Sequence, residues 1–229
     1  MNKNVPAKPL KYESFHRGIS THLRGYLSAL KQAIITSVNG RVLKPFVLAF
    51  SSCNPGEGVT TIATNFAYTF AEASEHRLLL VDCNLSRPSL HKVFQGDRSP
   101  GLVECITSES DLPWSIKHLT QGLDVLFAGG IVDDPWQMFG SRDFVRFLLE
   151  AKKNYNVTVL DCPPVVGVGE TTILTSKADA TVLVIESEKT RYEVAQRVQK
   201  MITNSGGNIL GVVLNKKRYH IPELLYKKI

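Results

Sequence analysis

The stretch FVLAFSSCNPGEGVTT, residues 46–61, decides the fold. Its apolar start, Phe46–Phe50, predicts a buried strand, and the turn Pro55–Gly58 then leads into a helical pattern at Thr60. A strand, a glycine-rich loop and a helix in this order present backbone N–H groups and a helix N-terminus to a phosphate. The stretch therefore predicts a phosphate-binding loop, and a turn without any ligand is the alternative.

The loop departs from the usual phosphate-loop pattern, G-x-x-x-x-G-K-[ST], at a position that matters. Cys53–Gly58 supplies the loop and Thr60 the hydroxyl, but Val59 stands where the pattern has lysine. That lysine brings a positive charge to the β- and γ-phosphates, whereas backbone amides offer only dipoles. Because Val59 keeps the backbone donor without the charge, we expect the loop to bind nucleotide weakly or not at all.

Size and composition indicate a soluble protein with one domain. The 229 residues allow one large α/β domain with a proper core, and 43% apolar and 21% charged residues are ordinary values. No apolar run approaches the roughly 20 residues that span a membrane, and the N-terminus lacks the apolar segment of a secretory signal. The four cysteines form no C-x-x-C pair and no zinc pattern, so we expect a cytoplasmic protein with reduced thiols.

The net charge of +6 is concentrated at the two ends of the chain. The basic residues there are Lys3, Lys8, Lys11, Lys216, Lys217, Arg218, Lys227 and Lys228. Such runs are usually solvated surface, and an anionic membrane face or an acidic partner is the functional alternative. Nucleic acid is not expected as a partner, because no aromatic or base-reading pattern accompanies the charge.

The chain divides into a lead, a domain and a tail. Residues 1–10 predict a flexible lead, and residues 11–229 predict a single domain that ends in a basic tail over 216–229. Apolar residues recur at spacings of four and three over the segment 11–40, which predicts an amphipathic helix that Asn39-Gly40 ends. The apolar face of this helix packs on the main sheet or forms a subunit interface.

Six apolar runs predict strands, and helical patterns lie between them. We expect strands at 46–51, 77–83, 123–127, 156–160, 180–185 and 209–214, and helices at 59–75, 141–153, 170–176 and 192–203. Strands that alternate with helices along the whole chain indicate a three-layer α/β/α fold with a doubly wound, mostly parallel sheet.

Two of the predicted strands end in an acidic residue. Asp82 and Asp161 lie where open α/β sheets place their ligand chemistry, facing the predicted loop. Magnesium prefers one or two carboxylates with phosphate oxygens and water, and Thr60 adds a hydroxyl. These three residues are therefore candidate metal ligands. The alternative, an aspartate that only caps a helix, explains one such residue more readily than two.

The order of these motifs resembles the bacterial tyrosine kinases (BY-kinases), which are relatives of the MinD/ParA ATPases. The resemblance covers nearly all of residues 12–229. It rests on PGEGVTT (Pro55–Thr61), VDCNLSRPSLHKVF (Val81–Phe94), Pro-Gly-Leu (Pro100–Leu102), VTVLDCPPVVG (Val157–Gly167), Ala178-Asp179-Ala180 before VLVIE, and GVVLN ending at Asn215. The R-P-S-L-H segment is the most specific of these matches.

The resemblance implies a P-loop NTPase fold, Mg-ATP or Mg-ADP as ligand, and a role in capsule or exopolysaccharide biosynthesis. It assigns nucleotide binding to Pro55, Gly56, Glu57, Gly58, Val59, Thr60, Thr61, Arg87 and, at the adenine, Asn215. It assigns Mg²⁺ to Thr60, Asp82 and Asp161, the catalytic base to Asp82, and the phosphate-accepting hydroxyls to Tyr219 and Tyr226.

Departures from the family pattern fall on charge, metal binding, assembly and substrate together. They are Glu13-x-x-His16-x-x-Ile19 for the assembly motif E-x-x-R-x-x-R, Val59 for lysine, Asn84 for the second acid of D-x-D, Ser86 for the first arginine of R-R-P, and a tyrosine cluster reduced to Tyr219 and Tyr226. Together these losses indicate an active site that has lost its activity on a fold that is kept.

Three functions follow as hypotheses. The first is a pseudokinase at the inner face of the plasma membrane, which binds the cytoplasmic tail of an inner-membrane polysaccharide co-polymerase or chain-length regulator. Self-association is a further expected contact of this pseudokinase. The second is an active tyrosine autokinase or ATPase, in which Arg87, or a basic residue donated by a partner such as Lys92, replaces the lysine. The third is a MinD-like positioning ATPase whose tail, Ile221–Ile229, forms an interfacial helix.

Overall fold

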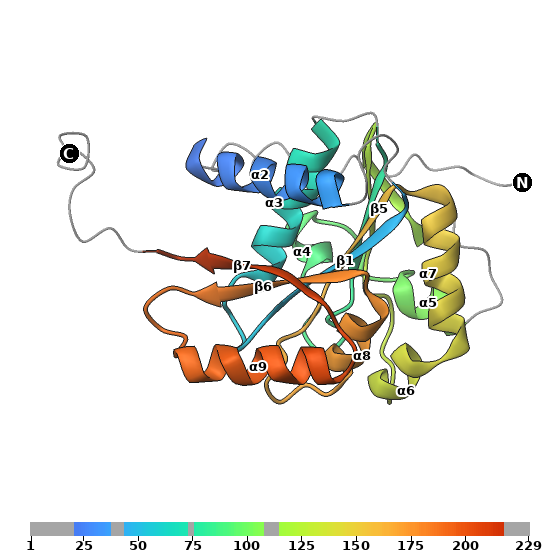
Figure 1. Ribbon diagram of the computed structural model, residues 1–229. Helices are drawn as coiled ribbons and strands as arrows, with labels where there is room; N and C mark the ends of the chain where they lie inside the picture. Colours follow the sequence, from blue (N-terminus) through green and yellow to red (C-terminus); the bar gives the residue numbers. More distant parts are fainter. Residues whose placement is uncertain (1–20, 38–43, 73–75, 108–114, 218–229) are drawn as a thin grey trace, which may run out of the picture.

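The structure, a computed structural model, describes residues 21–37, 44–72, 76–107 and 115–217 (Figure 1). Several predictions fall outside the described residues: the lead 1–10, the assembly motif at 13–19, the helix cap at 39–40, and the tail from residue 218, with Tyr219, Tyr226 and Ile221–Ile229.

A seven-stranded sheet forms the centre of the described ranges, in the order β3-β4-β2-β5-β1-β6-β7. Its strands are β1 (Phe46–Ser52), β2 (Leu78–Asp82), β3 (Lys117–Thr120), β4 (Leu123–Leu126), β5 (Val157–Asp161), β6 (Ala180–Glu186) and β7 (Ile209–Asn215). Neighbouring strands are parallel except β3 and β4, which are antiparallel. The predicted α/β fold with a mostly parallel sheet is confirmed.

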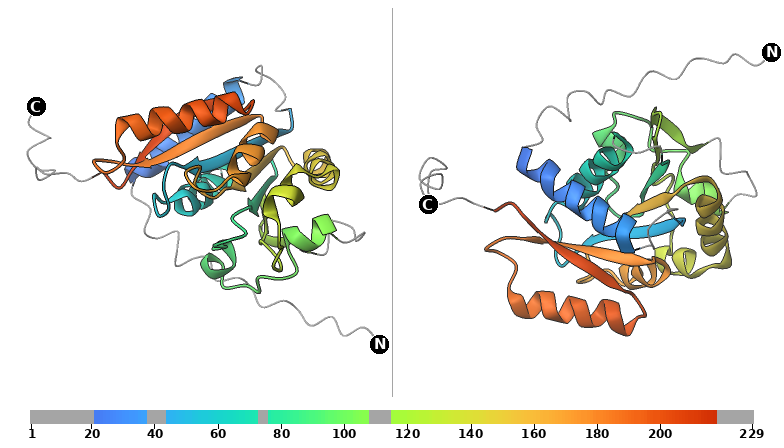
Figure 2. Two further views of the ribbon diagram at one scale, coloured as in Figure 1. Left: turned by 90° about the horizontal axis from the view of Figure 1, so that it is seen from below. Right: turned by 45° about the horizontal axis from the view of Figure 1, so that its top comes forward.

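Helices cover both faces of this sheet (Figures 1 and 2). They are α2 (Thr21–Ser37), α3 (Val59–Glu72), α4 (Leu90–Val93), α5 (Leu102–Thr107), α6 (Pro135–Gly140), α7 (Arg142–Asn154), α8 (Glu170–Lys177) and α9 (Tyr192–Asn204). On one face lie α2 and α3, and on the other lie α7, α8 and α9. None of the helices in the described part of the chain is long and apolar enough to cross a membrane.

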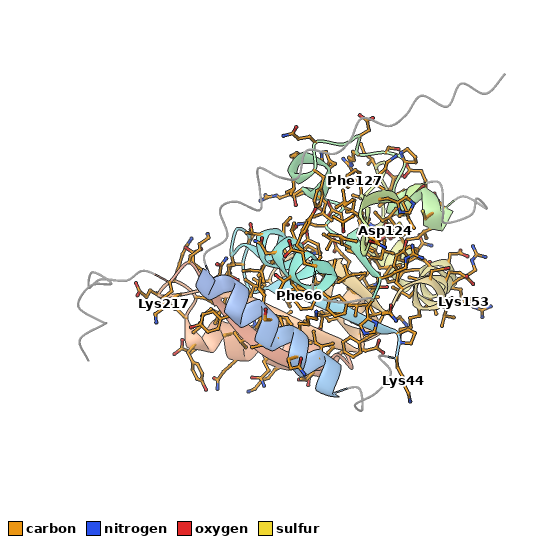
Figure 3. All side chains as sticks on the ribbon, turned by 90° about the horizontal axis from the view of Figure 1, so that it is seen from above. Lys44, Phe66, Asp124, Phe127, Lys153 and Lys217 are labelled. Carbon is orange, nitrogen blue, oxygen red and sulfur yellow. The ribbon has the colours of Figure 1, made fainter. Side chains whose placement is uncertain are left out.

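The core consists of apolar clusters on both faces of the sheet. In β1, Leu48 and Phe50 pack toward α2 and α3, and Val47 and Ala49 pack toward the helices of the opposite face. Phe66 of α3 lies over the first cluster, its ring centroid 5.4 Å from that of Phe50 (Figure 3). Because both faces are covered, β2 and β5 are buried along their whole length, which explains their continuous apolar runs.

The N-terminal amphipathic helix is α2, described from Thr21 onward. Leu27 and Ile34 on its apolar face are fully buried in the cluster that contains α3 and β1. Tyr26, on another side of the helix, is 72% exposed. Of the two uses that the sequence left open for the apolar face, packing within the domain is therefore the one observed.

Four short elements were not predicted: β3, α4, α5 and α6. The helices α4, α5 and α6 have four to six residues, too few for a helical period to stand out. The edge strand β3 alternates partly buried and exposed residues, without the apolar run of the central strands. Of these elements α4 matters for the site, because its N-terminus meets Asp82.

Candidate functional site

The carboxyl ends of β1, β2 and β5 meet at one edge of the sheet, beside a cavity of about 560 Å³. The cavity is lined by the loop 55–61 after β1, the segment 84–89 after β2 and the segment 162–168 after β5. In the strand order, β5 and β2 follow β1 in one direction, and β6 and β7 follow it in the other direction. Doubly wound sheets bind their ligands at such a switch point.

The backbone of the loop is arranged to receive an anion. Gly56 and Gly58 adopt positive φ angles of 82° and 97°, which glycine accepts without steric cost. The first backbone bond of α3 runs from the N–H of Ile62 to the carbonyl of Gly58 (3.0 Å). The N–H groups of Val59 to Thr61 therefore precede the helical ladder and lie at the positive end of the helix dipole, beside the cavity. These donors fit a phosphate group.

Glu57 takes part in the loop in a way that the sequence did not indicate. Its side chain is 3% exposed, and its carboxylate accepts the backbone N–H groups of Cys53 (2.8 Å) and Asn54 (3.0 Å). It also accepts the hydroxyl of Thr190, from the segment before α9. Burial and, secondarily, the Glu57 charge raise the pKa of the Cys53 thiol to about 12. Glu57 therefore braces the loop from inside rather than facing the cavity with its carboxylate.

The cavity has little positive charge. Val59 lines it at the position of the expected lysine, and Arg87 is the single cation among the described residues of its wall. Lys92, considered above as a donated cation, is exposed on α4 and lies outside this wall. The cavity wall therefore offers a triphosphate backbone dipoles and one exposed guanidinium.

Asp82 and Asp161 are in register with each other on β2 and β5. The carboxylate of Asp82 accepts backbone N–H groups from Asn84 (3.2 Å), Ser89 (2.9 Å) and Leu90 (3.0 Å). Burial nevertheless raises the pKa of Asp82 to about 6, against the lowering by these bonds and by the charge of Arg98. Asp82 therefore caps α4, as the alternative interpretation required, and still carries a strongly perturbed carboxyl group.

The second carboxylate is held by the hydroxyl predicted to share its metal. Asp161 is 1% exposed and accepts the hydroxyl of Thr60 at 2.7 Å. Thr60 is in turn 2.9 Å from the hydroxyl of Ser89. Burial and the facing Asp82 raise the pKa of Asp161 well above its usual range, and the Thr60 bond only partly opposes this. The structure thus brings the three predicted metal ligands together.

These oxygen donors have the chemistry of a magnesium site shared with a phosphate; of the three residues Thr60 lines the cavity, and both carboxylates are buried. The described residues contain no group of three or more His, Cys, Asp or Glu side chains able to hold a metal ion. Two carboxylates and a hydroxyl need additional oxygens from phosphate and water, which is the coordination that Mg²⁺ prefers. A divalent cation there would also neutralise the two coupled acids.

Two further residues of the predicted site have structural partners. The side chain of Asn84, which replaces the second family acid, accepts the backbone N–H of Arg87 (3.1 Å) in a turn beside the cavity. The amide of Asn215 donates to the carbonyl of Glu57 (2.8 Å). A Cβ on Gly58 would lie 2.2 Å from that amide nitrogen, so the loop and the end of β7 touch. An adenine contact by Asn215 stays a prediction.

Three residues near the site were missed from the sequence. Ser89 could have been predicted most easily, because it belongs to the R-P-S-L-H match and follows Arg87 by two positions. Its hydroxyl lies next to that of Thr60. Lys216 was assigned to the basic tail, although its position next to Asn215 placed it near the loop. No local pattern distinguished Thr190, whose partner Glu57 is 133 positions away.

Comparison with known proteins identifies the family. Tyrosine-protein kinase YwqD of Bacillus subtilis is 32% identical over 173 residues, which cover 75% of this chain and 72% of YwqD. The chain belongs to the bacterial tyrosine-protein kinases. Tyrosine-protein kinase CpsD of Streptococcus pneumoniae is 29% identical over 186 residues, or 80% of this chain and 82% of CpsD. No protein-family model matches the sequence.

Solved structures agree with this assignment. The VpsO kinase domain superposes with a TM-score of 0.73 at 28% identity, over 87% of this BY-kinase chain and 100% of the VpsO chain. The septum site-determining protein MinD from Pyrococcus horikoshii, solved with Mg-ADP, gives a TM-score of 0.64 at 20% identity, over 80% and 76% of the two chains. The second likeness shows the shared fold alone.

Proposed function

We propose that this BY-kinase homologue is a pseudokinase of capsular polysaccharide or exopolysaccharide biosynthesis. The observation that carries the proposal is Val59 in a phosphate loop whose backbone donors are in place. Phosphoryl transfer depends on positive charge that stabilises the transferring phosphoryl group. Without the lysine, the chain retains a site for weak nucleotide binding and loses the group that would promote the reaction.

Each part of the site has a distinct role in this proposal. The N–H groups at the start of α3 would bind phosphate oxygens, and Thr60, Asp82 and Asp161 would hold Mg²⁺, which supplies positive charge when bound. Two hydrogen bonds would keep the loop in its binding conformation: the one that the Glu57 carboxylate accepts from the N–H of Cys53, and the one that the Asn215 amide donates to the carbonyl of Glu57. Bound Mg-ATP or Mg-ADP would then act as a conformational signal rather than as a phosphate donor.

The partner in this proposal is the cytoplasmic tail of an inner-membrane polysaccharide co-polymerase or chain-length regulator. Family resemblance supports this partner and a peripheral location at the inner face of the membrane. Self-association would follow the family as well, although the assembly motif has lost both of its arginines. The nucleotide state of the loop is what the partner would detect.

A phosphotyrosine assay tests the proposal. The purified full chain is incubated with Mg-ATP, and tyrosine phosphorylation is measured by mass spectrometry beside an Asp82→Asn variant. We expect both proteins to remain unmodified. The proposal is wrong if the wild type labels its own tyrosines and the label disappears in Asp82→Asn and in Tyr219→Phe/Tyr226→Phe.

An active autokinase is the second candidate, and the pKa of Asp82 favours it. A general base works best when its pKa lies near the working pH, and burial raises that of Asp82 to about 6. Arg87, in the cavity wall, would then replace the missing charge. Under this candidate, Arg87→Ala abolishes the labelling that the phosphotyrosine assay detects in the wild type.

A further inference from the structure

The end of β7 is attached to the back of the phosphate loop. Besides the Asn215 amide on the carbonyl of Glu57, the next residue, Lys216, reaches the loop with its side chain. The Lys216 ammonium lies 2.7 Å from the carbonyl oxygen of Gly56, a residue that lines the cavity. Asn215, the last residue of β7, and Lys216 directly after it therefore bind two consecutive carbonyls of the loop.

The backbone of Lys216 is held in an unfavourable conformation to make this contact. Its φ angle is +55°, in the left-handed region that residues with a Cβ seldom adopt. Its N–H is bound by the side-chain oxygen of Asn215 at 2.9 Å. Such conformations persist where the surrounding structure imposes them, and they occur often at binding sites. The fold thus fixes the backbone position from which the Lys216 side chain extends.

We propose that Lys216 is the nucleotide-binding cation of this loop, displaced from the position that Val59 occupies. The inference rests on the nucleotide site of the proposed function and adds the residue that supplies its charge. A lysine ammonium has three protons, and the carbonyl of Gly56 and the carboxylate of Glu186 (3.0 Å) use two of them. The third proton and the flexible stem are left for a phosphate oxygen.

The Lys216 ammonium shares its acidic partner with a second lysine. Glu186 binds both Lys216 and Lys189, the latter at 3.3 Å, so that one carboxylate faces two ammonium groups. The hydrogen bond from Lys216 is the main cause that lowers the pKa of Glu186, which stays ionised. The Lys216 side chain is 46% exposed, so the ammonium can move toward a ligand without being desolvated first.

A purely structural role for Lys216 makes a different prediction. If the lysine only holds the carbonyl of Gly56, its loss changes the loop shape, and a charge placed elsewhere in the site will not restore binding. If the lysine supplies charge, a lysine at position 59 will restore it. The two roles therefore differ in the double variant Val59→Lys/Lys216→Met.

Isothermal titration of Mg-ADP into the full chain tests the proposal. We expect weak binding by the wild type, at least about tenfold weaker binding by Lys216→Met, and recovery in Val59→Lys/Lys216→Met. Lys189→Met is the matched control, because Lys189 pairs with the same Glu186 and is 73% exposed. We expect this control to bind as the wild type does, and thermal melts report whether each variant is folded.

Three results would overturn the inference: wild-type affinity in Lys216→Met, no recovery in the double variant, or no binding of Mg-ADP by the wild type. The first two results leave the pseudokinase proposal intact, because the phosphotyrosine assay decides it. The third would also remove nucleotide as the conformational signal of that proposal, while the lack of kinase activity would still be decided by the phosphotyrosine assay. Conversely, tyrosine labelling by the wild type would end the pseudokinase proposal and leave the role of Lys216 to the titration.

Discussion

Buried aspartates lie near both ends of the central strands β2 and β5: Asp124 of the neighbouring β4 near their beginning, and Asp82 and Asp161 at their end. The two ends differ in how the negative charge is compensated. Where these strands begin, Asp124 of β4 accepts the guanidinium of Arg77 (3.0 Å) and the hydroxyl of Tyr155 (2.7 Å), with His118 Nδ1 at 2.6 Å. Figure 3 shows Asp124 and Lys217 on opposite sides of the molecule, and Lys217 is the residue that follows Lys216 in the sequence. Every oxygen of this carboxylate has a partner.

At the opposite end, Asp82 and Asp161 face each other without a cation in direct contact among their described partners. Burial therefore raises the pKa of both groups. Removing the partners of a compensated buried acid is costly, whereas an uncompensated buried pair close to a cavity is a candidate for a site where a ligand supplies the missing charge. The difference between the two ends of the sheet separates structural acids from those of the site.

Removal of the compensated acid is expected to have the largest effect. Asp124→Ala leaves Arg77 and the buried hydroxyl of Tyr155 without their acceptor, and we expect it to lower the free energy of unfolding by about 3 kcal/mol. Denaturant titration measures this. As a control, Glu150→Ala removes only an exposed pair with Lys153 and should cost about 0.5 kcal/mol or less. Equal effects of the two substitutions would contradict the distinction.

Removal of an uncompensated acid should have the opposite sign. Asp161→Asn deletes one of the two facing charges and keeps an oxygen that can accept the Thr60 hydroxyl. We expect a stabilisation at pH 7.5 of about 1–2 kcal/mol, a rise in Tm of roughly 2–4 °C for each kcal/mol. A lower Tm for Asp161→Asn would show that the carboxylate is compensated in solution.

The pH dependence of that difference follows from the raised pKa values. A carboxyl group whose pKa is higher in the folded than in the unfolded state favours folding while it is protonated, and this contribution is lost as the pH rises through the folded pKa. For Asp82, the window runs from 3.8, its ordinary value, to about 6. The advantage of Asp161→Asn over the wild type should therefore shrink by about 1 kcal/mol between pH 7.5 and pH 5. An advantage independent of pH would contradict the assigned cause.

Magnesium alone should have the smallest effect. The ion favours the ionised form of Asp82 and Asp161, so it should raise the Tm of the wild type at pH 7.5. The free energy of unfolding should rise by about 0.4 kcal/mol when the magnesium concentration equals its Kd. Asp161→Asn should not respond. A response of equal size in both proteins would place the ion elsewhere.

The parts of the molecule that sequence predicted are those carried by local pattern. Apolar runs specify strands buried on both faces, and the glycine turn after β1 specifies the loop, so both were placed to within a few residues. The acids at the ends of β2 and β5 were predicted to meet, and Asp82 and Asp161 are in register. The short helix α4 lacks such a pattern and was not predicted. Because the helix was not predicted, the capping of its N-terminus by Asp82 was considered only as an alternative.

What the sequence did not show depends on contacts between distant segments. Lys216 meets Gly56 across 160 positions, and Thr190 meets Glu57 across 133. A lysine in a basic run looks like solvated surface until the fold brings it to a loop that lacks its own cation. Glu57 likewise looks like a residue that faces a ligand, and tertiary packing turns it inward.

The central claim is that this loop keeps the geometry of a nucleotide site and has lost charge at Val59. The most direct measurement is calorimetric titration of Mg-ADP into the wild type and into Val59→Lys. We predict weak binding by the wild type and at least about tenfold tighter binding by the variant, or about 1.4 kcal/mol. Equal affinities in the two proteins, or no binding by Val59→Lys, would contradict the claim.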